Sequence, residues 1–161
     1  MSFSPQSKVW IYQSNRPFTD EEVVSIENKV SDFTAQWKAH GHQLLAKAEV
    51  LYRFFIVFIV DEASAGVTGC SIDASVRVVK EIEQEHHLDL LNRFNMAYIA
   101  DGKVVVVNKE DFETLVSIKA VDRKTIVFNN MVQTLSEFEN KWQVPFEESW
   151  HKLVFAHLLQ A

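Results

Sequence analysis

The run Phe54-Phe55-Ile56-Val57-Phe58-Ile59-Val60 is the most hydrophobic stretch of the chain. It leaves no polar face, and it is much shorter than the roughly 20 apolar residues that a membrane-spanning helix needs. β-Branched and aromatic residues make up the whole run, and both types favour strands. We therefore predict a central strand that is buried on both of its faces.

A second strand and a long helix are predicted before this run. Residues 8–13 are mostly β-branched and aromatic, which is typical of a strand. Thr19 and Glu22 have the spacing of a capping box, in which the two residues cap each other's backbone N–H groups. One apolar stripe at helical spacing follows, formed by Val23, Ile26, Val30, Phe33 and Trp37. We predict a helix over 19–40 that ends at Gly41 in the left-handed conformation.

Shorter patterns predict the remaining elements. Asp101-Gly102 lies between two strand-like segments and is a strong signal for a type I′ hairpin turn. Asn108 and the second capping box, Thr134 to Glu137, indicate the starts of two more helices. The predicted strands are 45–50, 95–100, 103–107 and 125–128; the predicted helices are 71–87, a short one after 108, one before Pro145, and one over about 146–157.

The order of these elements predicts an α+β fold. Up to residue 100 the order is strand, helix, strand, strand, helix, strand, which is the split βαβ order of ferredoxin-like folds. The hairpin and the C-terminal helices would be additions to that core, and the helices 19–40 and 71–87 would cover the same face of the sheet. The sequence contains no repeat and no linker-like tract, so we expect a single domain over 1–161.

Composition limits the partners and the compartment. The net charge is −6 and no basic run exceeds two residues, which argues against a nucleic-acid partner because phosphate binding needs clustered Lys and Arg. One cysteine cannot form an internal disulfide, which fits a reducing compartment. The N-terminal residues lack the apolar stretch of a signal peptide, and no run is long enough for membrane insertion. These features favour a cytoplasmic protein.

Cys70 is the candidate catalytic residue. It lies where the loop after the hydrophobic run becomes a helix, and the free N–H groups of a helix start can stabilise a thiolate. A thiol enzyme would also need a histidine base from elsewhere in the fold. The alternative is that the sulfur packs between helix and sheet, and Asp73 in the first turn would oppose a thiolate. We expect the packed role.

Backbone N–H groups of the same loop could instead bind a small anion. The candidate residues are Thr68, Gly69 and Ser71. The alternative is that Thr68 or Ser71 only caps the helix and that Gly69 supplies a positive φ.

Two polar loops that follow strands add candidates at Arg16 and Asn129. Arg16 has two roles open to it: binding an anionic ligand, or pairing with an acidic side chain of its own fold. The histidines match no metal-site spacing, and the paired carboxylates lie on predicted helix surfaces, so we expect no metal and no cofactor.

Several segments resemble a family of small bacterial proteins that often carry the name "ABC transporter ATPase". These segments are 9–19 (Val-Trp-Ile-Tyr-Gln-Ser-Asn-Arg-Pro-Phe-Thr), 69–73 (Gly-Cys-Ser-Ile-Asp), 126–130 (Ile-Val-Phe-Asn-Asn) and 149–151 (Ser-Trp-His). The resemblance spans most of the chain and transfers no catalytic residue to it. An ATPase of that class needs a P-loop, Gly-x-x-x-x-Gly-Lys-[Ser/Thr]. No glycine of this chain starts or completes that motif, so we reject P-loop ATP hydrolysis.

The functional expectation is therefore general. The sequence favours a soluble binding or protein-interaction module whose partner is a protein or a small anionic ligand. The alternative is a thiol-dependent enzyme that uses Cys70.

Overall fold

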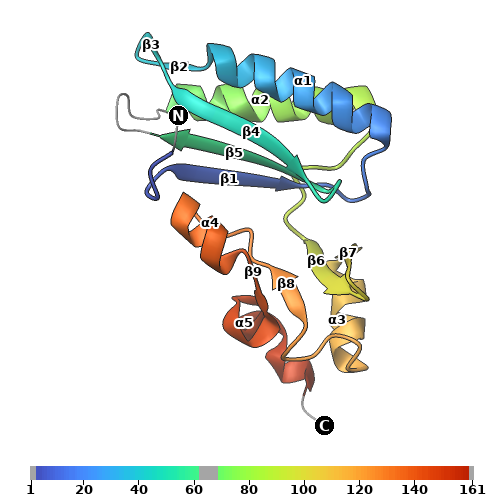
Figure 1. Cartoon of the computed structure of the whole chain (residues 1–161). Coiled ribbons are helices and arrows are strands. Elements are labelled where there is room, and N and C mark those ends of the chain that lie inside the picture. Colours follow the sequence, from blue (N-terminus) through green and yellow to red (C-terminus); the bar gives the residue numbers. More distant parts are fainter. Residues whose placement is uncertain (1–2, 62–68, 160–161) are drawn as a thin grey trace.

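The computed structural model describes residues 3–61 and 69–159, and of residues 69 and 70 it describes only the backbone. Helices combine with antiparallel sheets, so the predicted α+β class is confirmed (Figure 1). The larger elements form four layers: a pair of helices, a three-stranded sheet, a four-stranded sheet, and further helices on the far side.

The first sheet is built around the predicted central strand. Its strand order is β1-β5-β4, with β1 at Lys8–Gln13, β5 at Phe55–Asp61 and β4 at Leu45–Leu51. Every β5 residue from Phe55 to Val60 is buried, as predicted. Side chains alternate along a strand, so Ile56, Phe58 and Val60 pack on one face and Phe55, Val57 and Ile59 on the other.

Helices α1 (Asp20–Gln36) and α2 (Gly69–His86) cover the Phe58 face of this sheet together, which confirms their predicted common face. The Thr19–Glu22 capping box is also present. The predicted end of the first helix is wrong. The helix ends at Gln36, and His40 and Gly41, with φ of 52° and 77°, turn a small hairpin of β2 (Lys38–Ala39) and β3 (His42–Gln43).

The second sheet has the strand order β7-β6-β8-β9. The strands are β6 (Asn95–Ala100), β7 (Lys103–Asn108), β8 (Ile126–Phe128) and β9 (Gln143–Pro145). Asp101 and Gly102 both have positive φ, 53° and 75°, which confirms the hairpin between β6 and β7. A left-handed glycine is needed there because a side chain would be strained at that φ.

The helices after residue 108 begin largely where they were predicted. Asn108 caps α3 (Lys109–Ser117), and the second capping box starts α4 (Leu135–Lys141). The single helix predicted over about 146–157 is wrong. Three short helices replace it: η1 (Phe146–Glu148), α5 (His151–Phe155) and η2 (Ala156–Leu159).

The ferredoxin-like arrangement is not confirmed. In a split βαβ unit the two strands joined by the helix are parallel and lie on either side of an antiparallel strand. The strands β1, β4 and β5 have this arrangement, but β6, the fourth strand, belongs to the second sheet. The physical reason lies at the outer edge of β1, which is already occupied. The Val9 N–H donates to the Gln133 carbonyl (3.0 Å) and the Leu135 N–H donates to the Ser7 carbonyl (2.9 Å). The strand at 95–100 pairs instead with its own hairpin partner and with β8.

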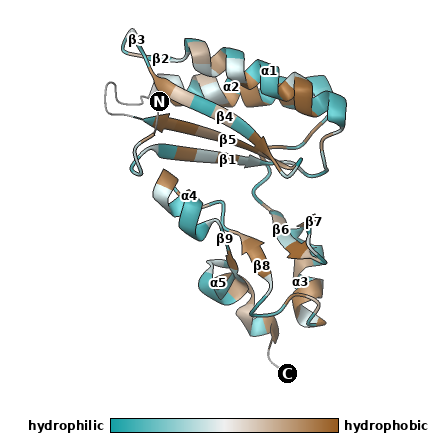
Figure 2. Ribbon diagram, in the orientation of Figure 1, coloured by the Kyte–Doolittle hydropathy of each residue, from teal (hydrophilic) through white to brown (hydrophobic). Residues whose placement is uncertain are grey.

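The two sheets pack on each other through a shared apolar core. Figure 2 shows hydrophobic residues along β5 and β8, which supply this core from opposite sides. A chain of side-chain amides also joins the sheets. Gln13 Nε2 donates to the Asn95 carbonyl (3.0 Å), and Asn130 Nδ2 donates to Gln13 Oε1 (2.8 Å). No helix within residues 3–61 and 69–159 has both the length and the apolar character needed to cross a membrane.

Candidate functional site

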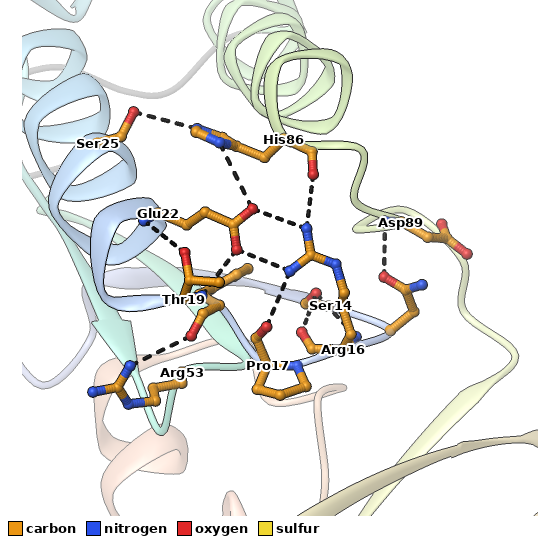
Figure 3. Close-up of polar contacts among 11 residues, drawn as sticks. Ser14, Arg16, Pro17, Thr19, Glu22, Ser25, Arg53, His86 and Asp89 are labelled. Atoms are coloured by element: carbon orange, nitrogen blue, oxygen red, sulfur yellow. Dashed lines mark hydrogen bonds and ion pairs between the residues drawn. The ribbon is translucent and has the colours of Figure 1, made fainter.

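Arg16 ties the start of α1 to the end of α2 (Figure 3). Its two terminal nitrogens donate to the two carboxylate oxygens of Glu22, both at 2.8 Å, in the bidentate geometry that suits a guanidinium. Arg16 Nη2 also donates to the His86 carbonyl at 2.7 Å, which is one of the carbonyls that a helix end leaves without an intrahelical partner. Of the two roles open to Arg16, pairing within its own fold is present.

This arrangement changes the acidity of Glu22. The hydrogen bonds from Arg16 lower the pKa of the Glu22 carboxyl from about 4.5 to about 2, and the Thr19 N–H adds to the effect at 2.9 Å. The Glu22 side chain is only 13% exposed. Glu22 therefore remains ionised at pH values near neutrality, where its carboxylate can pair with Arg16.

We expect Arg16→Gln to lower the free energy of unfolding by about 1–2 kcal/mol at pH 7, because Glu22 and the helix-end carbonyl both lose charge-assisted hydrogen bonds at a partly exposed site. The pKa of Glu22 is depressed in the folded state, so its contribution is complete above about pH 4.5 and is lost as the pH falls to about 2. Urea unfolding at several pH values should show the difference from wild type shrinking over this window. Arg53→Gln is the matched control, since Arg53 and Asp20 form a more exposed pair. An Arg16→Gln deficit that stays constant down to pH 2 would contradict this role.

An acidic hollow lies beside the Arg16–Glu22 ion pair. It is lined by Thr19, Glu21, Glu22, Ser25, Glu85, His86 and His87. Ser25 Oγ and His86 Nε2 share a hydrogen bond of 3.2 Å, and Lys29 on α1 pairs with Glu81 and Glu85 on α2. Carboxylates outnumber permanent cations around this hollow, so it does not suit an anionic ligand.

A second, more apolar hollow lies on the other side of the α1 start. We call it the Tyr52 hollow; it is lined by Asp20, Val23, Val24, Val50, Tyr52 and Arg53. Val24 is 60% exposed and Tyr52 is 52% exposed. Arg53 pairs with Asp20 at the rim and donates to the Phe18 carbonyl at 3.4 Å. The hollow thus presents two exposed apolar side chains next to one ion pair.

The turn that carries Tyr52 is strained. Tyr52 and Arg53 have φ of 54° and 61°, the left-handed region where bulky residues cost about 1–2 kcal/mol each. The Phe54 N–H closes the turn by donating to the Leu51 carbonyl at 3.1 Å, and further interactions hold it in place. The Phe18 N–H donates to the Arg53 carbonyl at 2.7 Å, Gln143 Nε2 donates to the Tyr52 hydroxyl at 2.8 Å, and the Tyr52 ring packs 5.8 Å from that of Phe128. Such strain is concentrated at ligand clamps and binding sites.

The structure separates Arg16 from the predicted anion loop. Ser71 is buried near the start of α2, and its carbonyl accepts a 2.9 Å hydrogen bond from Trp37 Nε1. Arg16 contacts the other end of the same helix, about 22 Å away at a rise of 1.5 Å per residue. Gly69 and Cys70 form the first residues of α2, whereas Thr68 and the Cys70 side chain lie outside the described part.

Asn129 belongs to a turn after β8. Its Oδ1 accepts from the Met131 N–H at 3.0 Å, and its own N–H donates to the Trp142 carbonyl at 2.6 Å. The neighbouring Asn130 accepts from Trp142 Nε1 at 2.9 Å and continues the amide chain between the sheets. These contacts stabilise the local fold.

Within the described residues, neither metal-ligating side chains nor a match to a known protein indicates a further functional site. Among the residues that the structure describes, no three or more His, Cys, Asp or Glu side chains form a group that could hold a metal ion. No family model matches the chain, and no curated protein and no solved structure matches it either. The Tyr52 hollow and the neighbouring acidic hollow are therefore interpreted from their own chemistry.

Proposed function

We propose that this chain is a cytoplasmic protein-interaction module that binds a partner protein at the Tyr52 hollow. The observation that supports this best is the pair of exposed apolar side chains, Val24 and Tyr52, around one hollow. Single exposed apolar residues are ordinary, but two that share a hollow on a rigid framework are typical of an interaction surface. Tyrosine is also among the residues that contribute most to binding at protein interfaces.

The charges nearby favour one kind of partner. Glu21 is exposed at the start of α1, where Asp20 pairs with Arg53, and Glu85 lies nearby on α2 in a pair with Lys29. Arg16 and Arg53 already have carboxylate partners, Glu22 and Asp20. These features support a partner segment with an apolar side chain next to Lys or Arg, and they count against a small anionic ligand.

Selection from a displayed library of random peptides tests this proposal. We expect wild-type protein to enrich peptides that combine an aromatic or aliphatic residue with Lys or Arg. Val24→Asp should weaken their binding at least about tenfold, equivalent to 1.4 kcal/mol, because it places a charge in the apolar contact. The matched control is Leu153→Asp, at a residue that is 87% exposed on α5, and it should bind like wild type. No enrichment, or equal loss in both variants, would refute the proposal.

A thiol-dependent enzyme that uses Cys70 is the second candidate. One observation favours it: the β2–β3 hairpin, which carries His40 and His42, contacts α2 through β2. Iodoacetamide labelling of the folded protein over a pH series tests it. We expect slow labelling that becomes fast only in denaturant; fast labelling with a midpoint near neutral pH would support the enzyme instead.

A further inference from the structure

One ion pair lies at the rim of the Tyr52 hollow, between Asp20 at the start of α1 and Arg53 in the turn before β5. Among the described residues that line this hollow, Asp20 is the one carboxylate and Arg53 is the one cation. A partner that brings Lys or Arg beside an apolar contact therefore finds a single lining residue of opposite charge, and Arg53 is already paired with it.

The backbone of Arg53 is held close to Asp20. The Phe18 N–H donates to the Arg53 carbonyl at 2.7 Å, and Phe18 lies only two residues before Asp20 in the chain. The pairing of the two side chains is therefore intramolecular and needs no further ordering of the backbone. The free protein thus keeps Arg53 next to the carboxylate that a basic partner would use.

The Arg53 side chain can nevertheless be displaced easily. Asp20 is 84% exposed and Arg53 is 55% exposed, so water screens their attraction. The other contact of the guanidinium, from Nη1 to the Phe18 carbonyl, is long at 3.4 Å (Figure 3). Exposed pairs of this kind shift an equilibrium by up to about fivefold. Arg53 can therefore move into solvent while its backbone stays in place.

We propose that Arg53 is an internal competitor for the basic residue of the partner: it pairs with Asp20 in the free protein, and the Lys or Arg of the partner replaces it in the complex. This competition rests on the proposed binding at the Tyr52 hollow, and it assigns the partner's cation to Asp20. A site that is occupied in the free protein binds more weakly by the fraction that is occupied. The ion pair therefore lowers the affinity for basic segments and leaves that for neutral segments unchanged.

Calorimetric titration of the full chain with a selected peptide, one that has Lys or Arg beside its apolar residue, tests this competition. Arg53→Gln should tighten binding by about two- to fivefold, because it frees Asp20. Asp20→Asn should weaken binding by a similar factor. A residue with only a structural role at this rim would weaken binding when it is replaced.

Two controls separate direct competition from a change in net charge. In an Asp20→Asn background, Arg53→Gln should leave the affinity unchanged, whereas a long-range effect of charge would persist there. The same peptide with Gln at its basic position should bind wild type and Arg53→Gln equally.

Val24→Asp shows which of the two proposals fails. If no peptide binds, or if Val24→Asp binds the peptide as well as wild type does, binding at the hollow and the competition are both wrong. The competition alone is overturned if binding needs Val24 and one of three results is found. These are enriched peptides without Lys or Arg, no tighter binding by Arg53→Gln, or equal tightening in the Asp20→Asn background.

Discussion

Trp142→Ala is expected to lower the free energy of unfolding by about 3–5 kcal/mol, the range for removing a large buried aromatic side chain. Trp142 is buried in the core between the two sheets. Its ring centroid lies 4.9 Å from that of Phe55 and 5.0 Å from that of Phe128. The first of these rings belongs to one sheet and the second to the other, so the substitution opens a cavity in the junction itself.

Urea unfolding followed by circular dichroism measures this effect. Trp142→Phe separates packing from hydrogen bonding, because it keeps a ring and loses the donor to Asn130; we expect it to cost about 1–2 kcal/mol. Leu153→Ala at the exposed α5 position should change stability by less than about 0.5 kcal/mol. A Trp142→Ala variant as stable as Leu153→Ala would show that the sheets do not depend on this junction.

Stability should also fall steeply between pH 6.5 and pH 4, because His151 is buried in neutral form. Its side chain is 1% exposed, and its ring stacks on Trp150 at 3.9 Å among other aromatic rings. Burial lowers the pKa of His151 from 6.5 to about 4. Ser149 Oγ lies 2.7 Å from its Nδ1 and satisfies this nitrogen without a charge.

The direction of this pH dependence follows from the lowered pKa of His151. The unfolded chain binds a proton at His151 below about pH 6.5, whereas the folded chain binds it only below about pH 4. The contribution of neutral His151 to the free energy of unfolding is therefore complete above pH 6.5. It is lost progressively as the pH falls to 4, by about 3 kcal/mol in total. Carboxylates also titrate near pH 4. The informative quantity is therefore the difference in stability between wild type and a variant that lacks the His151 imidazole.

His151→Gln supplies that difference. It replaces the imidazole by a neutral side chain, so its urea midpoint should vary less with pH over the same window, even if the variant is less stable throughout. His157→Gln, at an exposed histidine six residues later, is the matched control and should keep the wild-type pH profile. Parallel profiles for wild type and His151→Gln would mean that His151 is not held neutral by the fold.

Features set by neighbouring residues were predictable from the sequence. The capping boxes at Thr19 and Thr134, the turn at Asp101-Gly102 and the buried strand after Phe54 are all present. Each depends on residue types a few positions apart. The pairing at the outer edge of β1 was not predictable in this way. Residues 133–135 form hydrogen bonds along the outer edge of β1, more than 120 positions away in the sequence. No local sequence pattern indicates this pairing.

The candidate site was predicted only in part. Arg16 was identified from its loop position, and the acidic partner that the sequence left open is Glu22, which also belongs to the capping box. The turn at Tyr52-Arg53 was missed because it contains no Gly, Asn, Asp or Pro, the residues that usually signal left-handed backbone. Besides the local hydrogen bond from the Phe54 N–H to the Leu51 carbonyl, its conformation is held by contacts with Phe18, Gln143 and Phe128, all of which are distant in the sequence.

Binding at the Tyr52 hollow is the central claim, and amide chemical-shift mapping tests it most directly. The isotope-labelled full chain is titrated with a peptide that contains an apolar residue flanked by Lys or Arg, taken from the selection above. We predict that saturable shifts concentrate at Asp20 to Val24 and at Val50 to Arg53, and that they are absent in Val24→Asp. Shifts that concentrate elsewhere, for example on α5, or no saturable shifts with any such peptide, would contradict the account.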